Sequence, residues 1–361
     1  MIELDGSYGE GGGQIVRTAL AISALIGMPF EVKDIRKGRG KGGGLKPQHL
    51  NSVNALKQLC NAEAKGAEIG SKELVFTPGK FKAKNLKIDI GTAGSTTLLL
   101  QALLLPCIFA DKMHTLTLKG GTDVAWSMPY DYFANVLVPQ LNPLCEIKPS
   151  LVKRGYYPKG GGEVKIQFRP RLHRNDSFEK VWEELQKIHH FRLVEQGHLI
   201  SVKGVSHASE TLANAKVAER QAESAKQKLR QLGCPVDIRI EYAQTLSPGS
   251  GITLWAIFSK TPDDIDELHP LRIGADALGK PGKPAEKVGL EAAKNLLEEI
   301  SRKAPVDRHL ADNLVPFLAL CKPSVMKATE ITMHTITNIY VVEKFLGKQF
   351  TLNKAERIIS T

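Results

Sequence analysis

The first 20 residues, MIELDGSYGEGGGQIVRTAL, contain an apolar segment, a glycine loop and the start of an amphipathic stretch. Met1–Leu4 predicts a short strand. Apolar side chains between Ile15 and Leu25 recur at helical spacing, and Gly27 is a typical residue for ending a helix. The glycine loop at Gly9–Gly13 connects the two elements. A strand, a glycine turn and a helix in this order predict an α/β fold.

The same order returns further along the chain. Gly91–Ser95 lies between an expected strand at Leu86–Ile90 and an expected helix at Leu98–Ala110. Further glycine turns occur at Gly120–Thr122 and Gly160–Gly162. A recurring element of this kind predicts internal repeats of one α/β unit.

The pattern changes after about Pro170, where the glycine turns stop. A long polar helix is expected at Ser209–Leu232, and the glycine turns resume at Gly274–Gly282. We therefore expect a large α/β (α+β) repeat domain formed by residues 1–180 and 277–361. A smaller inserted α/β domain is expected at residues 181–276.

The composition of the 361 residues is that of a folded protein, with 42% hydrophobic and 24% charged residues. Lysine and arginine number 49 against 38 aspartates and glutamates, which gives a formal charge of +11. This surplus favours an anionic partner such as a nucleic acid. A generally basic proteome is the alternative explanation.

We expect a cytoplasmic protein with no membrane partner. The N-terminus lacks the basic and apolar segments of a secretory signal. The most apolar run, Leu98–Ala110, is shorter than the roughly 20 residues that a membrane span needs. The 5 cysteines show no zinc-ligand spacing, which indicates reduced thiols.

Two glycine-rich loops are candidate anion sites. The backbone N–H groups of Gly9–Gly13 precede a helix, whose N-terminus favours anions, although a tight turn explains the glycines equally well. Glu10 in this loop could hold a divalent cation, or it is a solvated acid. Arg36 and Arg39 in the second loop, with Arg17, could bind phosphates through their planar guanidinium groups. A solvated basic loop is the alternative.

Gln101 and His309 are the other candidates. Gln101 lies in an apolar helix, so its amide needs a hydrogen-bond partner from the protein or from a ligand. His309 follows Asp307, a plausible N-cap, and is expected in the first turn of a helix. The positive helix end disfavours imidazolium, and a neutral imidazole is a nucleophile. A histidine in this position is otherwise usually structural.

Several motifs occur in the order typical of one family. Together with the opening block they resemble the RNA 3′-terminal phosphate cyclase family over nearly the whole chain. The motifs are PQHL (47–50), GTAGS (91–95), KGGT (119–122), GYYPKGGGEV (155–164), HLAD (309–312) and HTITNI (334–339).

The resemblance implies a fold and a chemistry. The fold would contain three repeated α/β units, each with a four-stranded sheet and two helices, and a smaller α/β domain inserted before the last unit. In the chemistry, a histidine attacks the α-phosphate of ATP and retains AMP. The AMP passes to an RNA 3′-phosphate, and the neighbouring 2′-hydroxyl closes a 2′,3′-cyclic phosphate. The implied partners are ATP and RNA with a 3′-phosphate end, and the implied metal is Mg²⁺ or Mn²⁺.

The resemblance also implies roles for single residues. The nucleophile corresponds to His309 and the metal-binding acid to Glu10. The remaining implied positions bind nucleotide or phosphate: Arg17, Arg36, Arg39, Gln101, Pro129, Lys283, Pro284, Ala285, Glu286 and Lys287.

Two other interpretations stay open from the sequence. A non-catalytic branch of the same fold family acts in ribosome assembly and is expected to lack the histidine. An enolpyruvyl transferase has a related repeated fold but needs no covalent AMP. His309 in its motif disfavours both.

Overall fold

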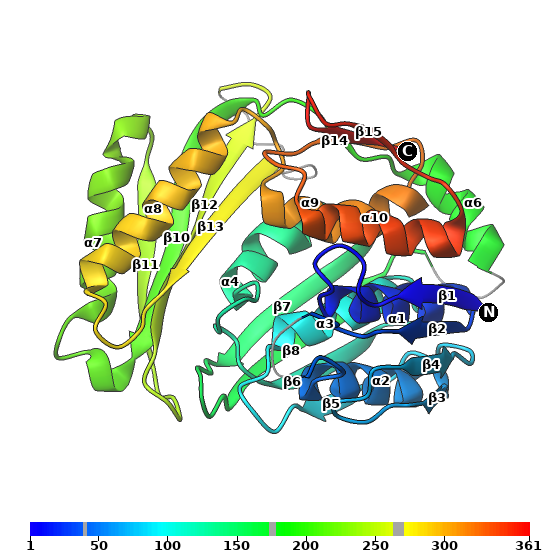
Figure 1. The fold of residues 1–361 in the computed structure, drawn as a ribbon. Helices are drawn as coiled ribbons and strands as arrows, with labels where there is room; N and C mark the ends of the chain where they lie inside the picture. The colour runs from blue at the N-terminus through cyan, green and yellow to red at the C-terminus, as the bar shows by residue number, and fades with distance from the viewer. Residues whose placement is uncertain (39–41, 173–177, 263–270) are drawn as a thin grey trace.

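The architecture consists of four sheets with helices packed against them (Figure 1). The computed structural model describes residues 1–38, 42–172, 178–262 and 271–361. Within these residues each sheet has four strands. None of the helices in the described ranges combines the length and the apolar character that a membrane crossing requires.

Three of the sheets repeat one strand order. In each, the first two strands along the chain are parallel neighbours, and the remaining pairings are antiparallel. The first sheet has the spatial order β1 (Ile2–Asp5), β2 (Phe30–Lys33), β4 (Leu74–Thr77), β3 (Glu63–Lys65). The second has the order β5 (Leu86–Asp89), β6 (His114–Gly120), β8 (Gly162–Pro170), β7 (Cys145–Lys153). The third has the order β9 (Arg192–Leu193), β14 (Val325–Lys327), β16 (Ile358–Ser360), β15 (Thr351–Asn353).

Helices follow the strands in the same way in each repeat. The first repeat has α1 (Gln14–Ile26) and α2 (Pro47–Cys60). The second has α3 (Thr96–Ile108) and a continuous segment of α4 (Tyr130–Tyr132), the π-helical η1 (Phe133–Leu137) and α5 (Val138–Leu141). The third has α9 (Arg308–Leu320) and α10 (Met333–Leu346), and α6 (Phe178–Ile188) precedes its first strand. The repeated α/β units expected from the sequence are confirmed.

The inserted unit has a different strand order. Its sheet runs β11 (Val236–Ala243), β10 (His198–Ser209), β12 (Ser250–Ser259), β13 (Leu271–Leu278), and only β10 and β11 are parallel. The unit also contains α7 (Val217–Leu229), α8 (Ala285–Ser301) and the short 3₁₀ turns η2 (Glu210–Leu212) and η3 (Arg230–Leu232). Figure 1 shows α7 and α8 on the outer side of this sheet.

The inserted sheet buries both of its faces. Ile273, Ala275 and Ala277 share a hydrophobic cluster with α7 and α8. Trp255 and Ile257 lie at alternate positions of β12 and join the large cluster of the repeats. Because side chains alternate along a strand, one face packs on its own helices and the other on the rest of the molecule.

The pairings correct the limits that the sequence suggested for the insert. β9 lies within residues 181–276 but pairs with β14 of the last repeat. The insertion therefore interrupts the last repeat between β9 and α9, instead of preceding that repeat. At the other end, β13 extends to Leu278, and α8 packs on α7 and β13 although it lies within residues 277–361. Two pieces of secondary structure also differ from expectation: α7 begins at Val217, and Gly274 lies inside β13 instead of in a turn.

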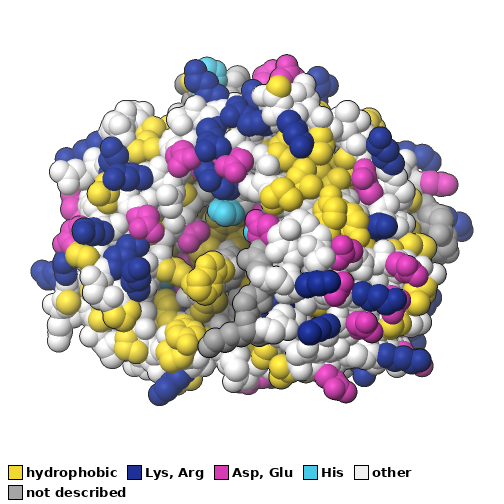
Figure 2. All heavy atoms as spheres, viewed as in Figure 1, with side chains coloured by type: hydrophobic (Ala, Val, Ile, Leu, Met, Phe, Trp, Pro, Cys, Tyr) yellow, Lys and Arg dark blue, Asp and Glu magenta, His cyan; other side chains and the backbone are white. Residues whose placement is uncertain are grey.

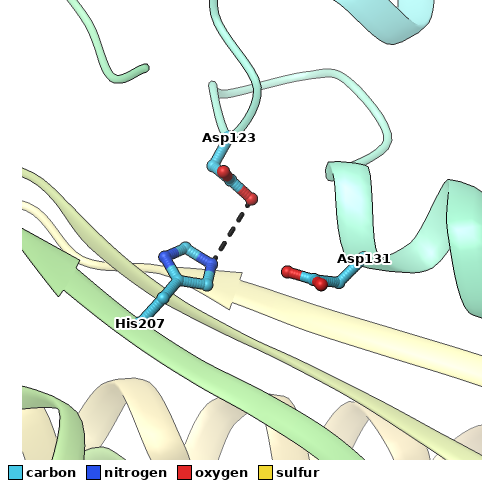
Figure 3. A group of neighbouring side chains, drawn as sticks. All are labelled: Asp123, Asp131 and His207. Atoms are coloured by element: carbon cyan, nitrogen blue, oxygen red, sulfur yellow. Dashed lines mark ion pairs between the residues drawn. The ribbon is translucent and has the colours of Figure 1, made fainter. Parts of the chain in front are cut away.

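A buried ionic network joins the inserted unit to the second repeat. Arg154 is 1% exposed. Its guanidinium group donates to Asp123 Oδ2 at 3.1 Å, Asp131 Oδ2 at 2.8 Å and Glu241 Oε1 at 2.8 Å, the last from β11. His207 of β10 completes the network, with Nε2 3.3 Å from Asp123 Oδ1 (Figure 3). One arginine therefore compensates carboxylates from both units.

Replacing Arg154 with methionine is expected to destabilise the protein strongly. The substitution keeps much of the volume but leaves Asp123 and Asp131 buried without their cation, a change that typically costs about 3–5 kcal/mol. Guanidinium chloride unfolding measures the loss. The matched control is Arg169→Met, because Arg169 pairs with Glu146 at the surface and should contribute less than about 1 kcal/mol. Equal, small losses in the two variants would contradict the role assigned to Arg154.

Candidate active site

His309 lies in the first turn of α9, with an exposed side chain. Asp307 is the N-cap of this helix. Its Oδ1 accepts hydrogen bonds from the backbone N–H groups of His309 and Leu310, both at 2.9 Å. The N-cap and the first-turn position predicted from the sequence are confirmed. The main chain of His309 is therefore held at a helix N-terminus, and its exposed imidazole is accessible to a ligand.

The Asp307 carboxylate also binds two other parts of the molecule. Tyr132 of α4 donates its hydroxyl to Oδ1 at 2.6 Å, and Gly274 of β13 donates its N–H to Oδ2 at 2.9 Å. Burial raises the pKa of Asp307, while His309 and these donors act in the opposite direction. Gly274 is required for close approach, because an added Cβ would lie 2.5 Å from the Tyr132 ring. The start of α9 is thus fixed against the second repeat and the insert together.

A chain of hydrogen bonds connects α1, α3 and α9 and ends at the main chain of His309. Arg17 Nε of α1 donates to Gln101 Oε1 of α3 at 2.9 Å. Gln101 Nε2 donates to Asn313 Oδ1 of α9 at 3.0 Å, and Asn313 Nδ2 donates to the His309 carbonyl at 2.7 Å. The sequence predicted that the Gln101 amide needs a hydrogen-bond partner. Both its oxygen and its nitrogen have one, Arg17 and Asn313 respectively. The structure brings Arg17, Gln101 and His309 into one connected group.

The glycine loop of α1 faces a group of basic side chains. Burial, with a further contribution from Arg36, lowers the pKa of Arg17 to about 10. His49 of α2 accepts the Lys46 N–H at Nδ1. Its buried Nε2 therefore carries the proton, and it has no hydrogen-bond partner among the described residues. A Cβ on Gly13 would lie 2.0 Å from that Nε2 and 3.1 Å from Arg17 Nη1.

This arrangement is suited to an anion. Arg17 lies at the N-terminus of α1, and Arg36 is close enough to lower the pKa of both Arg17 and the neighbouring His49. Sequence reasoning did not select His49, because a lone histidine in a helix gave no signal of its own. Arg39, the other predicted phosphate ligand of the basic loop, lies outside the described residues.

Glu10 lies on the other side of the same loop. Its Oε2 is 3.3 Å from His334 Nε2 of α10. His334 is fixed by Gln14, whose Oε1 lies 2.6 Å from Nδ1 and whose Nε2 donates to the His334 carbonyl at 3.0 Å. A carboxylate oxygen and an imidazole nitrogen are donors that suit Mn²⁺, and the carboxylate also suits Mg²⁺. The donor set at Glu10 therefore fits the implied metal.

The remaining positions predicted to bind nucleotide, Pro129 and residues 283–287, lie in two different places. Pro129 is the N-cap of α4, the helix that carries Tyr132 to Asp307. Lys283 lies before α8, where its Nζ pairs with Glu291 at 2.8 Å and donates to the Leu278 carbonyl at 3.3 Å.

The rest of that stretch forms the start of α8. Pro284 is its N-cap, Ala285 is buried and Lys287 is exposed. Glu286 accepts hydrogen bonds from Arg220 of α7 at 2.6 and 2.9 Å, so its carboxylate is turned toward the inserted helices.

Asp276 is a further carboxyl group at the site that the sequence did not indicate. It shares a face of β13 with Gly274, the residue that contacts Asp307. Burial raises the pKa of Asp276 to about 6, and the charge of His309 acts in the opposite direction. An isolated aspartate in a strand gives no sequence signal for such a position.

A second group of possible metal ligands lies where the inserted unit meets the second repeat. Asp123, Asp131 and His207 have ligand atoms within 4.8 Å of one another. Arg154 already donates to both aspartates, and Tyr156 lies 2.7 Å from His207 Nδ1 through its hydroxyl. Burial opposes the ionisation of Asp123, but His207 and Arg154 hold the pKa of that carboxyl below its usual value. The charges of this group are compensated by the protein itself.

Figure 2 shows the face of the molecule in which a hollow opens between the inserted unit and the repeats. Lysine and arginine side chains gather along its upper edge, and hydrophobic side chains lie along its lower edge.

A family model described as RNA 3′-terminal phosphate cyclase matches residues 8–352. The chain belongs to the RNA 3′-terminal phosphate cyclase family.

Relatives named RNA 3′-terminal phosphate cyclase are similar over nearly their whole lengths. The protein from Pyrococcus furiosus is 46% identical over 351 residues, which cover 97% of this chain and 94% of the relative. The protein from Archaeoglobus fulgidus is 44% identical over 352 residues, covering 96% of each. The protein from Methanosarcina acetivorans is 44% identical over 364 residues, covering 99% of this chain and 98% of the relative. The cyclase resemblance inferred from the motifs is confirmed.

The free energy of unfolding of the protein below neutral pH should depend on the protonation of His49. Its pKa is lowered to about 3, first by burial and then by Arg17. In the unfolded chain His49 takes up its proton near pH 6.5. The stability that the folded protein has with His49 neutral is therefore complete above that pH, and it is lost as the pH falls toward 3. Between pH 7 and pH 5 the loss should be about 2 kcal/mol.

The matched variant is His49→Asn, which keeps an acceptor for the Lys46 N–H and cannot titrate. Urea unfolding at the two pH values should show a smaller loss in this variant than in the parent. Equal losses would mean that His49 is not held neutral in the folded protein.

Proposed function

We propose that this protein converts an RNA 3′-phosphate to a 2′,3′-cyclic phosphate with consumption of ATP, through AMP carried on His309. The observation that supports this best is the exposed imidazole of His309 at a helix N-terminus fixed by Asp307. The names of the relatives agree with the overall reaction.

In the first step a ring nitrogen of His309 attacks the α-phosphorus of ATP. A nitrogen–phosphorus bond forms, the bond to the bridging oxygen breaks, and pyrophosphate leaves. The His309 main chain is held by Asp307 on one side and by Asn313 on the other, so the backbone that carries the attacking imidazole is fixed before the substrate arrives. The N-terminus of α9 also favours the negative charge of the phosphate.

In the second step an oxygen of the RNA 3′-phosphate attacks the phosphorus of the histidyl adenylate and displaces the imidazole. In the third step the neighbouring 2′-hydroxyl attacks the activated 3′-phosphate. It loses its proton and expels AMP. The nucleophile and the phosphate are then parts of one nucleotide, so proximity supplies much of the rate.

The anion site beside α1 is suited to the RNA 3′-phosphate. Arg17 and Arg36 would provide charge, and the N-terminus of α1 would provide backbone N–H donors. Arg17 also reaches the His309 carbonyl through Gln101 and Asn313, so a phosphate bound there is linked to the nucleophile. Glu10 and His334 would hold the divalent metal, which would neutralise charge on the triphosphate. A non-catalytic RNA-binding member of the fold family would not need this exposed histidine.

Replacing His309 with alanine should abolish transfer of label from α-labelled ATP to the protein. Label from γ-labelled ATP should never be retained, because pyrophosphate leaves in the same step. His198→Ala is the matched control, since His198 is another exposed histidine and lies on β10. Retention of α-label by the His309 variant would overturn the proposed nucleophile, and absence of label in the parent would favour the RNA-binding alternative.

Removing Arg36 and Arg39 together should weaken RNA binding more than self-adenylation. If each contacts one phosphate, the slope of log affinity against log salt should fall by about 1.4 for single-stranded RNA. Filter binding at several salt concentrations measures this slope. A double Lys344→Ala, Lys348→Ala variant controls for loss of charge elsewhere. An unchanged slope in the Arg36/Arg39 variant would exclude the basic loop from the RNA surface.

A further inference from the structure

Trp126 is the most exposed of the large hydrophobic side chains in the described residues, at 98%. It belongs to the loop between β6 and α4. Its φ of +60° lies in the left-handed region, which a bulky aromatic residue adopts only at a cost. An aromatic ring held in solvent by unfavourable backbone geometry is an arrangement that folding alone does not favour.

The loop that presents Trp126 is rigid at its base. The Tyr130 N–H donates to the Thr122 carbonyl at 3.0 Å and closes the loop. On one side Asp123 is held by buried Arg154, and on the other the Met128 carbonyl accepts the Thr97 hydroxyl at 2.6 Å. The ring is therefore presented by a fixed scaffold.

The same loop leads into the proposed active site. It ends at Pro129, the N-cap of α4, and Tyr132 of that helix donates to Asp307 beside His309. Trp126 is thus exposed on the loop that leads into a helix holding the N-cap of the nucleophile's helix. A small nucleotide enclosed in the site would not need a fully exposed ring, whereas a polymer that continues out of the site could extend along this loop.

We infer that Trp126 stacks on a base of the bound RNA upstream of its 3′-phosphate. The flat face of an indole binds any nucleobase, and stacking of this kind is tolerant of sequence. The net charge of +11 supplies the attraction for the backbone, and Trp126 would add contact with a base. This inference rests on the proposed function, because it takes RNA with a 3′-phosphate as the substrate.

Intrinsic fluorescence tests the contact directly. The chain has 3 tryptophans, and Trp126 is the exposed one, since Trp255 is 6% exposed and Trp182 is partly buried. Titration with a 3′-phosphorylated oligoribonucleotide should quench the emission of the parent. The quenching should be lost in Trp126→Phe, which keeps a ring for stacking and should retain RNA affinity. Quenching that is unchanged in this variant would overturn the inference.

Affinity provides the second measurement. Trp126→Ala should weaken binding of the same RNA by on the order of 10-fold, without lowering the melting temperature. Met113→Ala is the control, because Met113 is 51% exposed and lies before the opposite end of β6. The KM for ATP in self-adenylation should not change in Trp126→Ala. A raised KM for ATP with unchanged RNA affinity would assign the ring to the adenine of ATP and overturn the RNA contact.

The two proposals fail in different ways. If the parent protein formed no covalent adenylate, the proposed function would be contradicted. The quenching of Trp126 fluorescence by RNA could still be measured. Normal self-adenylation with equal RNA affinity in the parent and Trp126→Ala would contradict only the stacking contact.

Discussion

The buried carboxylate of Asp307 is the interaction on which the proposed site depends most. It accepts hydrogen bonds from the first turn of α9, from the Tyr132 hydroxyl of the second repeat and from the Gly274 N–H of the insert. Burying a carboxylate is unfavourable, as the raised pKa of Asp307 indicates, and it is tolerated because its oxygens have four donors. The position of His309 is therefore determined by three parts of the fold that are far apart in the sequence.

The repeats explain how a chain of polar side chains connects their first helices. Arg17, Gln101 and Asn313 lie on α1, α3 and α9, the first helices of the three repeats. These side chains hydrogen-bond one another in order, and the chain ends at the His309 carbonyl. The same chain links the guanidinium group of Arg17, through Gln101, to the helix that carries the nucleophile. The relative positions of Arg17 and the helix of His309 are thus fixed by hydrogen bonds between the first helices of the three repeats.

Features that depend on local spacing could be predicted from the sequence. The helices of the repeats, the Asp307 cap and the need of Gln101 for a partner all follow from residues close in the chain or from burial of one amide. The limits of the insert could not be predicted. Its neighbour β9 contains only Arg192 and Leu193, and it is defined by pairing with the distant residues Val325 and Met326. Asp276, His49 and Asn313 were also missed, since each acquires its place through contacts between distant segments. The family resemblance alone supplied the candidate roles of Pro129 and Lys283–Lys287, and these roles, like the metal-binding role of Glu10, remain predictions.

The central claim is that the imidazole of His309, whose main chain is held by Asp307, receives the adenylate. Peptide mapping by tandem mass spectrometry, after incubation of the parent protein with ATP and Mg²⁺ or Mn²⁺ and digestion under alkaline conditions, tests it most directly. The account predicts a single adenylate on the peptide that contains His309, with fragment ions that place it on the imidazole. An adenylate found on a lysine, or on a histidine other than His309, would contradict the account.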